Sequence, residues 1–469
     1  MNTYAQSTTD TPRTPAPVPA DFALAVDASQ RALARGWLWL GIIALVTSGL
    51  FSVLLVLART PGVNAWLPGT DFFRVALVLH VVLSVLVWFV AVAGMLWSIS
   101  TTSRGEAWSW VALGAAGAGT VLMSVAPFVS PGTPIMANYI PVIESPPFIA
   151  GLVVFGVSAA LLVLRTIVAA RPVGRAPDGA AALRFGLNAA AVSAAVALIA
   201  FVWSVVVVPA GLDAEAYYEI VFWGGGHALQ FTWTLLMLVA WLWLASACGG
   251  RVPLSPRVAM LVLAIALISV FATPYAYLAY PDITGMEHRD LHTWVMRFGG
   301  GVAILPIALA VVLALARAPR VSSEARVLRA ALISSIVLFT AGGVIGMMIS
   351  GSTVKIPAHY HGSIVGVTLA LMGLVYYLMP RLGWGTPRGR LAVAQPYLYG
   401  TGQLLHIAGL MWAGGYGVQR KVAGADQVLQ APGQVFGMGL MGAGGLLAII
   451  GGLLFVVVVA RAMRAPAAR

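Results

Sequence analysis

The chain has 469 residues, few of them charged, and a single cysteine. Only 9% of the residues are charged, whereas soluble domains have about a quarter. Together with the 60% of hydrophobic residues, this excludes an ordinary soluble fold and indicates a polytopic helical membrane protein. The lone Cys248 excludes an internal disulfide and a cysteine-based metal cluster.

The hydrophobic residues form runs long enough to cross a bilayer as helices. They cover residues 36–58, 72–100, 107–130, 147–168, 184–209, 218–247, 257–280, 291–316, 327–350, 356–380, 396–418 and 435–460. The sequence therefore predicts an all-α polytopic membrane bundle of about twelve transmembrane helices, embedded in lipid, over residues 36–460. Residues 1–35 are expected to form a disordered cytoplasmic tail, and residues 461–469 a short second one.

The basic residues predict the orientation of this bundle. The net charge is +12, but the basic residues are spread over many joints, so we expect no nucleic-acid partner. With both termini inside, most Lys and Arg fall on the inner side, as the positive-inside rule requires. This predicts a multi-pass protein of a bacterial inner (cytoplasmic) membrane with both termini cytoplasmic. The outer joints hold acidic residues that favour proton uptake from outside: Glu144, Asp213, Glu215, Asp282, Glu287 and Asp290.

Histidines are scarce and unevenly placed. Of seven, all but His406 fall near the outer ends of four predicted helices: His80, His227, His288, His292, His359 and His361. At ~1.5 Å per residue these lie in the outer third of the membrane. A simple alternative is that these histidines lie at the membrane interface and extend their rings to water. His80 and His227 lie too deep in the membrane for this explanation.

The motif "HYH" sets His359 and His361 two residues apart at the start of the 356–380 helix. Residues at this spacing point ~200° apart, so the two imidazoles cannot bind one metal together. Neutral imidazole is a common axial ligand of haem iron. One haem on each side of the helix would explain the spacing. His80 would then complete one six-coordinate iron, and the other iron would keep an open position.

These features resemble the catalytic subunit I of the heme-copper oxidases, a superfamily of cytochrome c oxidases, quinol oxidases and nitric oxide reductases. The resemblance covers about residues 36–460. It rests on "HYH", on "WGGGH" at 223–227 and on "GGYGVQRK" at 414–421.

The resemblance also implies roles for particular residues. His80 and His361 would hold a low-spin haem, and His359 would be the proximal ligand of a high-spin haem. His227 would bind a second metal, copper or non-haem iron. Three further residues would contact the haems, Arg420 and Lys421 at the propionates and Tyr360 between the two haems. The glycines before His227 would let the helix backbone approach a haem.

Two departures from the family pattern concern the second metal. The positions of the family's adjacent histidine pair lie here near Tyr275 and Ala276, and the chain contains no adjacent pair. Four residues after His227, oxidases have Tyr and nitric oxide reductases have Glu, but this chain has Phe231. The missing pair and tyrosine favour NO over O2 as the substrate.

The stretch "EHRDLH" suggests a substitute, because His288 and His292 share one helical face at i, i+4. Glu287 and Asp290 could serve as ligands or as partners of the ligands. The alternative to a metal site is a charged, solvent-exposed loop at the start of a helix. If the two histidines reach His227, they form a three-imidazole site. Their predicted place at the rim favours a haem-only site instead.

We therefore expect a respiratory oxidoreductase. Electrons from a cytochrome c-type subunit or quinol would pass through the low-spin haem to the high-spin haem, which reduces O2 or NO with His359 and His227 as catalytic residues. The alternative is a haem-only membrane protein that binds gas or transfers electrons. His406 is expected to be a hydrogen-bonded core histidine. A transporter would need broken helices or carboxylates at mid-membrane, which are scarce.

Overall fold

The computed structural model describes residues 21–64, 70–175, 177–318 and 322–465. Its first half contains η1 (Ala28–Gln30), α1 (Arg31–Arg59), α2 (Thr70–Val81), the π-helical η3 (Val82–Val87), α3 (Trp88–Ser100), α4 (Glu106–Val129), β1 (Thr133–Ile135), β2 (Val142–Glu144), α5 (Pro146–Val168), α6 (Gly179–Val207) and α7 (Ala214–Ala247). Its second half contains α8 (Pro256–Val270), α9 (Ala272–Ala279), α10 (Met286–Gly299), α11 (Gly301–Arg317), α12 (Ser323–Met347), α13 (Lys355–Leu378), α14 (Arg390–Gly415), η4 (Gly424–Asp426) and α15 (Pro432–Arg464).

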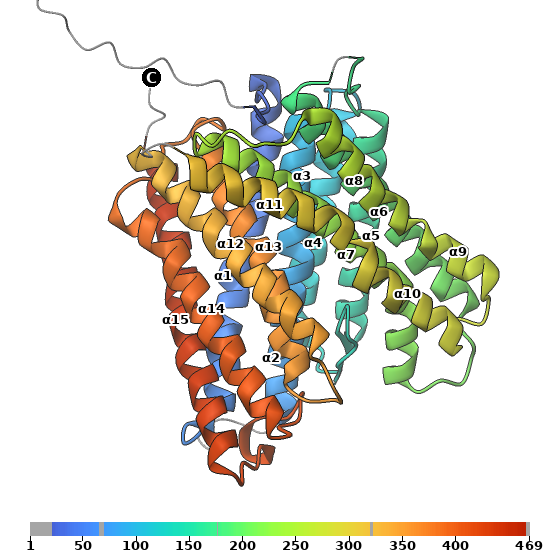
Figure 1. Cartoon of the computed structure of the whole chain (residues 1–469). Coiled ribbons are helices and arrows are strands. Elements are labelled where there is room, and N and C mark those ends of the chain that lie inside the picture. The colour runs from blue at the N-terminus through green and yellow to red at the C-terminus, as the bar shows by residue number, and fades with distance from the viewer. Residues whose placement is uncertain (1–20, 65–69, 176, 319–321, 466–469) are drawn as a thin grey trace, which may run out of the picture.

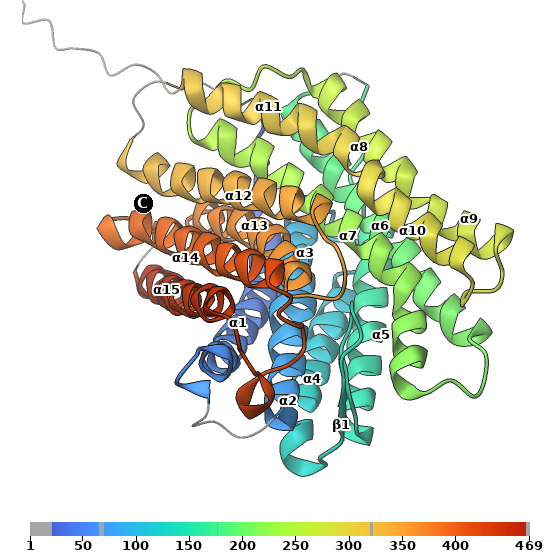
Figure 2. The same ribbon diagram turned by 60° about the horizontal axis from the view of Figure 1, so that its bottom comes forward.

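The predicted all-α membrane bundle is confirmed. Within the described residues, 11 helical stretches are long and apolar enough to cross a membrane. The twelfth predicted segment corresponds to α14, which is less apolar because it contains Gln395, Gln403 and His406. The helices lie side by side, and the first and last described residues lie at the same end (Figure 1, Figure 2). The β1–β2 hairpin lies at the opposite end (Figure 1).

Two predicted helices are each split in two. The 257–280 segment breaks after Val270, where α8 ends and α9 begins at Ala272. Pro274 causes this break, since proline cannot donate a backbone hydrogen bond to the carbonyl four residues earlier and its ring clashes with that carbonyl. The 291–316 segment begins earlier than predicted, at Met286, and is interrupted at Gly300.

Part of the expected N-terminal tail is ordered. Residues 1–20 lie outside the described part of the chain, but α1 begins at Arg31, inside the range predicted to be disordered. Phe22 is fully buried and its backbone N–H donates to Ser246 Oγ at 3.1 Å. The prediction missed this because the segment is polar and packs on the distant end of α7. At the other terminus, α15 continues to Arg464, past the predicted start of the tail.

The helix starts follow local sequence signals. Asp178, Asp213, Ser255 and Ser322 each accept a hydrogen bond from a first-turn backbone N–H, at the starts of α6, α7, α8 and α12. These side chains satisfy donors that a helix start leaves unpaired. α6, α7 and α12 therefore begin four to five residues before the starts that the apolar runs predicted.

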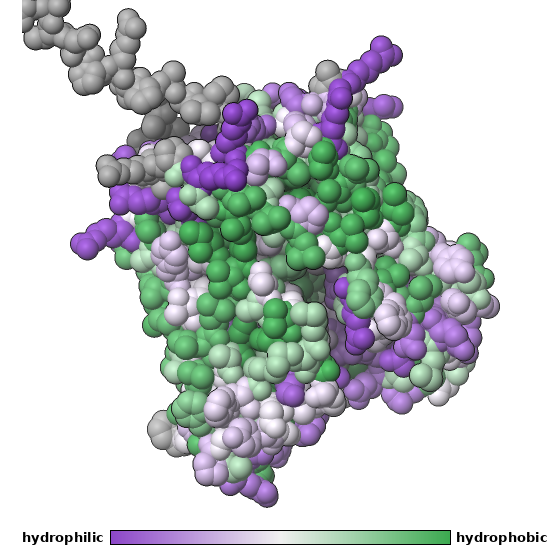
Figure 3. All heavy atoms as spheres, viewed as in Figure 1, coloured by the Kyte–Doolittle hydropathy of each residue, from purple (hydrophilic) through white to green (hydrophobic). Residues whose placement is uncertain are grey.

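The outer surface is largely apolar, as expected for a chain that faces lipid. Val206, Phe128 and Leu305 are among its most exposed side chains, at 76%, 74% and 72%. Figure 3 shows this apolar band and one interruption, a hollow with hydrophilic residues between the part formed by α12 and α13 and the part formed by α9 and α10.

Candidate functional site

The histidines share one hydrogen-bonding arrangement. Each of the seven places Nδ1 within hydrogen-bond distance of a backbone carbonyl. The pairs are His80–Ser48 (3.2 Å), His227–Trp223 (2.8 Å), His288–Tyr280 (3.0 Å), His292–His288 (2.8 Å), His359–Gly342 (2.8 Å), His361–Pro357 (2.8 Å) and His406–Met441 (3.0 Å). A carbonyl oxygen only accepts, so the proton of each neutral ring lies on Nδ1. Nε2 then carries the lone pair, the state in which histidine binds a metal.

His359 and His361 face different neighbours, as their spacing requires. His359 donates to the carbonyl of Gly342 on α12. A Cβ on Gly346, one turn further along α12, would lie 2.7 Å from His359 Nδ1, so glycine is needed there. His361 instead faces α14, where its ring centroid lies 4.8 Å from that of His406.

His80 forms one histidine group with His361 and His406. Its Nδ1 also lies 2.9 Å from Ser48 Oγ on α1. His80, His361 and His406 lie close enough to interact electrostatically. His80 lies two residues before the π-helical η3, a rare conformation that often occurs at functional sites. His406 makes the hydrogen bond expected of a core histidine, but its contact with His361 was not foreseen.

Another histidine group, His227, His288 and His292, lies between α7 and α10. The ring centroids of His227 and His292 are 5.6 Å apart, and those of His292 and His288 are 4.8 Å apart. All three side chains are buried, with 3%, 3% and 1% exposure in that order. The predicted rim position does not keep His292 away from His227, because α10 begins before His288 and carries both rings inward. The expected haem-only site stays a prediction.

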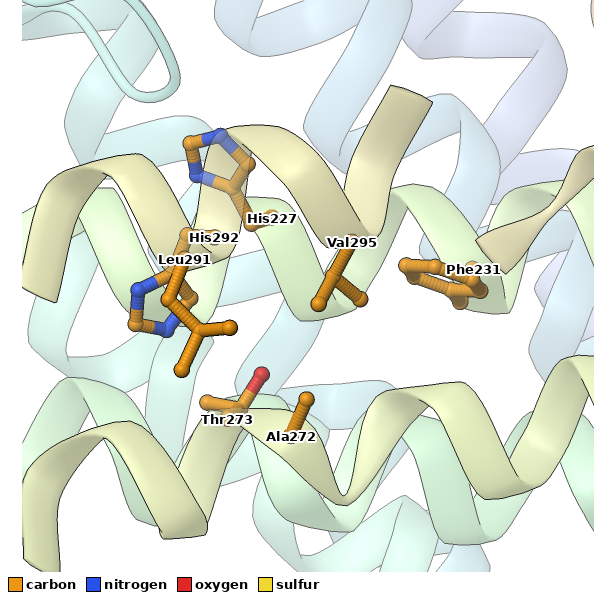
Figure 4. A pocket seen from close by; sticks show the side chains of 7 residues that line it. All are labelled: His227, Phe231, Ala272, Thr273, Leu291, His292 and Val295. Atoms are coloured by element: carbon orange, nitrogen blue, oxygen red, sulfur yellow. The ribbon is translucent and has the colours of Figure 1, made fainter. Parts of the chain in front are cut away.

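This group borders a small pocket. His227 and His292 lie at one end of it and Phe231 at the other, with Val295 between them (Figure 4). Nε2 of His292 is buried and has no hydrogen-bond partner among the described residues. Among the described residues, no group of three or more His, Cys, Asp or Glu side chains is already arranged to hold a metal ion. His292 thus has an imidazole on each side, but the three rings do not form a ready metal site.

Sequence reasoning missed Tyr139, which lies between β1 and β2. Because Nδ1 of His227 carries the proton, the Tyr139 hydroxyl donates to His227 Nε2, at 2.9 Å. A Cβ on Gly226 would lie 2.2 Å from the Tyr139 ring. Burial raises the pKa of Tyr139 well above its ordinary value, with smaller contributions from Tyr360 and Glu219. The phenol therefore stays protonated and can act as a donor.

The other glycines before His227 also face aromatic rings. A Cβ on Gly224 would lie 2.5 Å from the Tyr277 hydroxyl, and one on Gly225 would lie 2.4 Å from the Phe201 ring. The glycines of "WGGGH" thus let aromatic side chains approach α7. These consecutive glycines are the sequence feature from which close aromatic neighbours of α7 could have been predicted.

Arg420 and Lys421 hold the loop that carries Tyr139. Arg420 Nη1 donates to Asn138 Oδ1 at 3.1 Å, and Lys421 Nζ donates to the carbonyl of Met136. Lys421 is the only non-glycine residue with positive φ among those described, at 65°. Burial and the neighbouring Arg420 lower the pKa of Lys421.

Two acidic residues of α7 complete this arrangement. The backbone N–H of Asn138 donates to Glu219 Oε2 at 2.8 Å, and its side-chain amide also donates to Glu219. Glu215 lies 3.8 Å from Lys421 Nζ. The hairpin loop is therefore fixed between α7 and the segment after α14.

Comparison with known proteins identifies the family. A family model described as cytochrome c and quinol oxidase polypeptide I matches residues 32–457. The chain belongs to this family. The predicted membership of the heme-copper oxidase subunit I superfamily is thereby confirmed.

Individual relatives agree with this assignment. An uncharacterized protein of Rickettsia prowazekii (strain Madrid E) is 28% identical, over 92% of this chain and 96% of its own length. An uncharacterized protein of Aquifex aeolicus (strain VF5) is 25% identical, over 77% of this chain and 88% of its own length. The solved structure of a heme-copper terminal oxidase dimer matches with a TM-score of 0.74 at 20% identity, over 95% of this chain and 86% of that one. This last match shows the shared fold.

Membership of the oxidase family makes the α9 region informative. Tyr275 and Ala276 stand where the family's histidine pair was expected, and the Tyr275 side chain is 58% exposed. The next residue, Tyr277, instead contacts His288, with ring centroids 4.7 Å apart. In this member of the oxidase family, α9 thus supplies a phenol ring to the cluster, and the additional imidazoles come from α10.

Proposed function

We propose that this oxidase-family subunit is a membrane oxidoreductase that reduces a small gas, with NO favoured over O2. A low-spin haem on His80 and His361 would accept electrons from a cytochrome c-type subunit or quinol. A high-spin haem on His359 would bind the gas. The observation that carries this proposal is the placement of His359 and His361 on different sides of α13, each with Nδ1 held by a carbonyl.

The residues present fit two haems. Axial ligation needs a neutral imidazole with a free Nε2 and an oriented ring, and His80, His359 and His361 meet this requirement. All three side chains are only partly buried, so the rings are not fully enclosed by protein atoms. Bound haem would supply electron transfer and an iron position for the gas.

The chain's own residues would hold and deliver a proton near His227. Tyr139 is a protonated donor on His227 Nε2. Glu219 binds the adjacent Asn138, so an outer-end carboxylate lies beside this donor. This arrangement supports proton supply from the outer side, and together with Phe231 in place of tyrosine it favours NO. Arg420 and Lys421, at the same end, are proposed to pair with the haem propionates.

A spectroscopic experiment tests the haem assignment. In the purified protein, a reduced spectrum should contain two haems, and CO should shift only one of them. His80→Ala and His361→Ala should each abolish the low-spin signal, whereas His359→Ala should abolish CO binding. A single haem, or an unchanged low-spin spectrum in His80→Ala, would contradict the assignment. Consumption of NO and of O2 by the same preparation then decides between the two gases.

A haem-only gas-binding or electron-transfer protein is the second candidate. It is favoured by the absence, among the described residues, of a three-ligand group already arranged for a metal. Haem spectra would be the same for both candidates. Absence of turnover with either gas in a preparation that binds CO would favour the haem-only protein.

A further inference from the structure

We propose that Arg289 of α10 supplies a fixed positive charge to the gas-binding site beside His227. Negative charge shifts onto a bound gas molecule as electrons reach it, and a cation held nearby stabilises that charge. The inference deepens the proposed function and rests on it for the haem that binds the gas. It gives a role to a side chain that neither the motifs nor the histidine groups account for.

Two contacts fix Arg289 against Trp223 of α7. The guanidinium carbon of Arg289 lies 4.7 Å from the centroid of the Trp223 ring, within the range of a cation–π interaction. The indole N–H of Trp223 also donates to the backbone carbonyl of Arg289 at 3.3 Å. The charge and the tryptophan are thereby held together across the contact between α10 and α7.

Trp223 in turn contacts His227, one turn further along α7. Their ring centroids are 4.7 Å apart, and the Trp223 carbonyl accepts the hydrogen bond from His227 Nδ1 at 2.8 Å. The guanidinium of Arg289 and the imidazole of His227 therefore lie on the same indole ring, close enough to interact electrostatically. The positive charge thus lies beside the histidine that we place near the gas.

No described carboxylate neutralises this charge. Arg289 forms no ion pair within the described part of the chain. Glu287 and Asp290 are its neighbours in the sequence, but both are exposed, and residues one or two positions apart on a helix do not face each other. Arg289 itself is half-buried, so water and salt screen its charge less than that of an exposed arginine. An uncompensated positive field therefore remains at the site.

A purely structural role for Arg289 leads to a different expectation. If the side chain only fastened α10 to α7, replacing it would lower stability and leave the electronic state of a bound gas unchanged. If its charge acts on the gas, a neutral side chain must change that state and a lysine must preserve it. The vibration of bound CO distinguishes the two roles.

The experiment uses the purified, haem-containing full chain and CO as the probe. A positive charge near bound CO draws electron density onto it and lowers the C–O stretching frequency, which infrared spectroscopy measures. The frequency should rise in Arg289→Gln and stay near the wild-type value in Arg289→Lys. Arg297→Gln is the matched control, because Arg297 is an exposed arginine two turns further along α10, and its frequency should not change.

An anionic ligand gives a second readout. Azide binding to the oxidised protein should weaken by roughly tenfold in Arg289→Gln, because one attraction between unit charges is lost. Arg289→Lys should retain most of the affinity, and Arg297→Gln all of it. Titration followed by haem absorbance measures these affinities.

Each outcome has a distinct meaning. An unshifted CO frequency in Arg289→Gln would overturn the proposal and leave the haem assignment standing. An equal shift in Arg289→Lys or in Arg297→Gln would also overturn it, because the effect would then not follow the charge at residue 289. If no haem of the wild-type chain binds CO, the proposed function fails, and this inference fails with it.

A second variant decides if Arg289→Gln does not fold. Thr293→Glu leaves Arg289 in place and adds a carboxylate four residues further along α10, where it can pair with the guanidinium. The added negative charge offsets the field, so the CO frequency should rise as in Arg289→Gln. An unchanged frequency in Thr293→Glu would contradict the proposal.

Discussion

The Tyr139 hydroxyl donates a hydrogen bond to Nε2 of His227, with 2.9 Å between the oxygen and the nitrogen. The two residues are far apart in the chain, one in the β1–β2 loop and the other in α7. Their contact requires Gly226, whose missing side chain leaves room for the phenol ring. A hairpin loop thus contacts directly a histidine that we propose lies near the gas-binding haem.

Tyr139→Phe should lower the free energy of unfolding by about 1 kcal/mol, the net value of one buried hydrogen bond. Thermal unfolding of the metal-free protein in detergent measures this change. Tyr275→Phe is the control, because the Tyr275 side chain is 58% exposed and its hydroxyl should contribute little. Equal effects of the two substitutions would mean that the His227 contact does not stabilise the fold.

His406→Asn should preserve the low-spin haem signal, because His80 and His361 are the proposed ligands. It removes the ring that contacts His361 and alters the hydrogen bond to Met441, so stability should fall. Reduced-minus-oxidised absorbance measures the haem, and unfolding temperature measures stability. Loss of the low-spin signal with CO binding intact would instead assign His406 as a haem ligand.

Gly444→Ala should destabilise the contact between α14 and α15 by about 1–3 kcal/mol, the usual cost of overpacking. The new Cβ would lie 2.3 Å from the backbone nitrogen of His406 and 2.7 Å from the carbonyl oxygen of Gly402. Gly439→Ala in the same helix is the matched control, since a Cβ there meets nothing within 4 Å. It should be neutral or stabilise by up to about 1 kcal/mol. Thermal unfolding compares the two variants.

Lys421→Met should loosen the β1–β2 loop, because the ammonium group donates to the Met136 carbonyl and lies near Glu215. Hydrogen exchange of residues 133–144 should become faster, while exchange in α13 should not change. Lys355→Met is a suitable control, since Lys355 Nζ donates to Ser350 Oγ and not to the hairpin. Unchanged exchange in the hairpin would show that Arg420 and Glu219 alone suffice to hold it.

The sequence by itself determined the membrane bundle and the approximate position of each long helix, with several helix starts a turn or more earlier than predicted. Long apolar runs have one stable form in lipid, because each backbone polar group must find its partner within the helix. Capping residues such as Asp178 and Ser322 mark helix starts locally. The opposite directions of His359 and His361 were also predictable, because the angle between two side chains on a helix depends only on their spacing in the sequence.

Only the tertiary structure decided which side chains meet. Tyr139 and His227 are brought together by a hairpin fixed between α7 and Lys421, and no local pattern encodes that contact. His292 lies beside His227, and His288 beside His292, because α10 packs against α7 with both of its imidazoles buried. Such contacts depend on how separate helices pack and on where glycine lets them approach, which spacing along one helix does not specify.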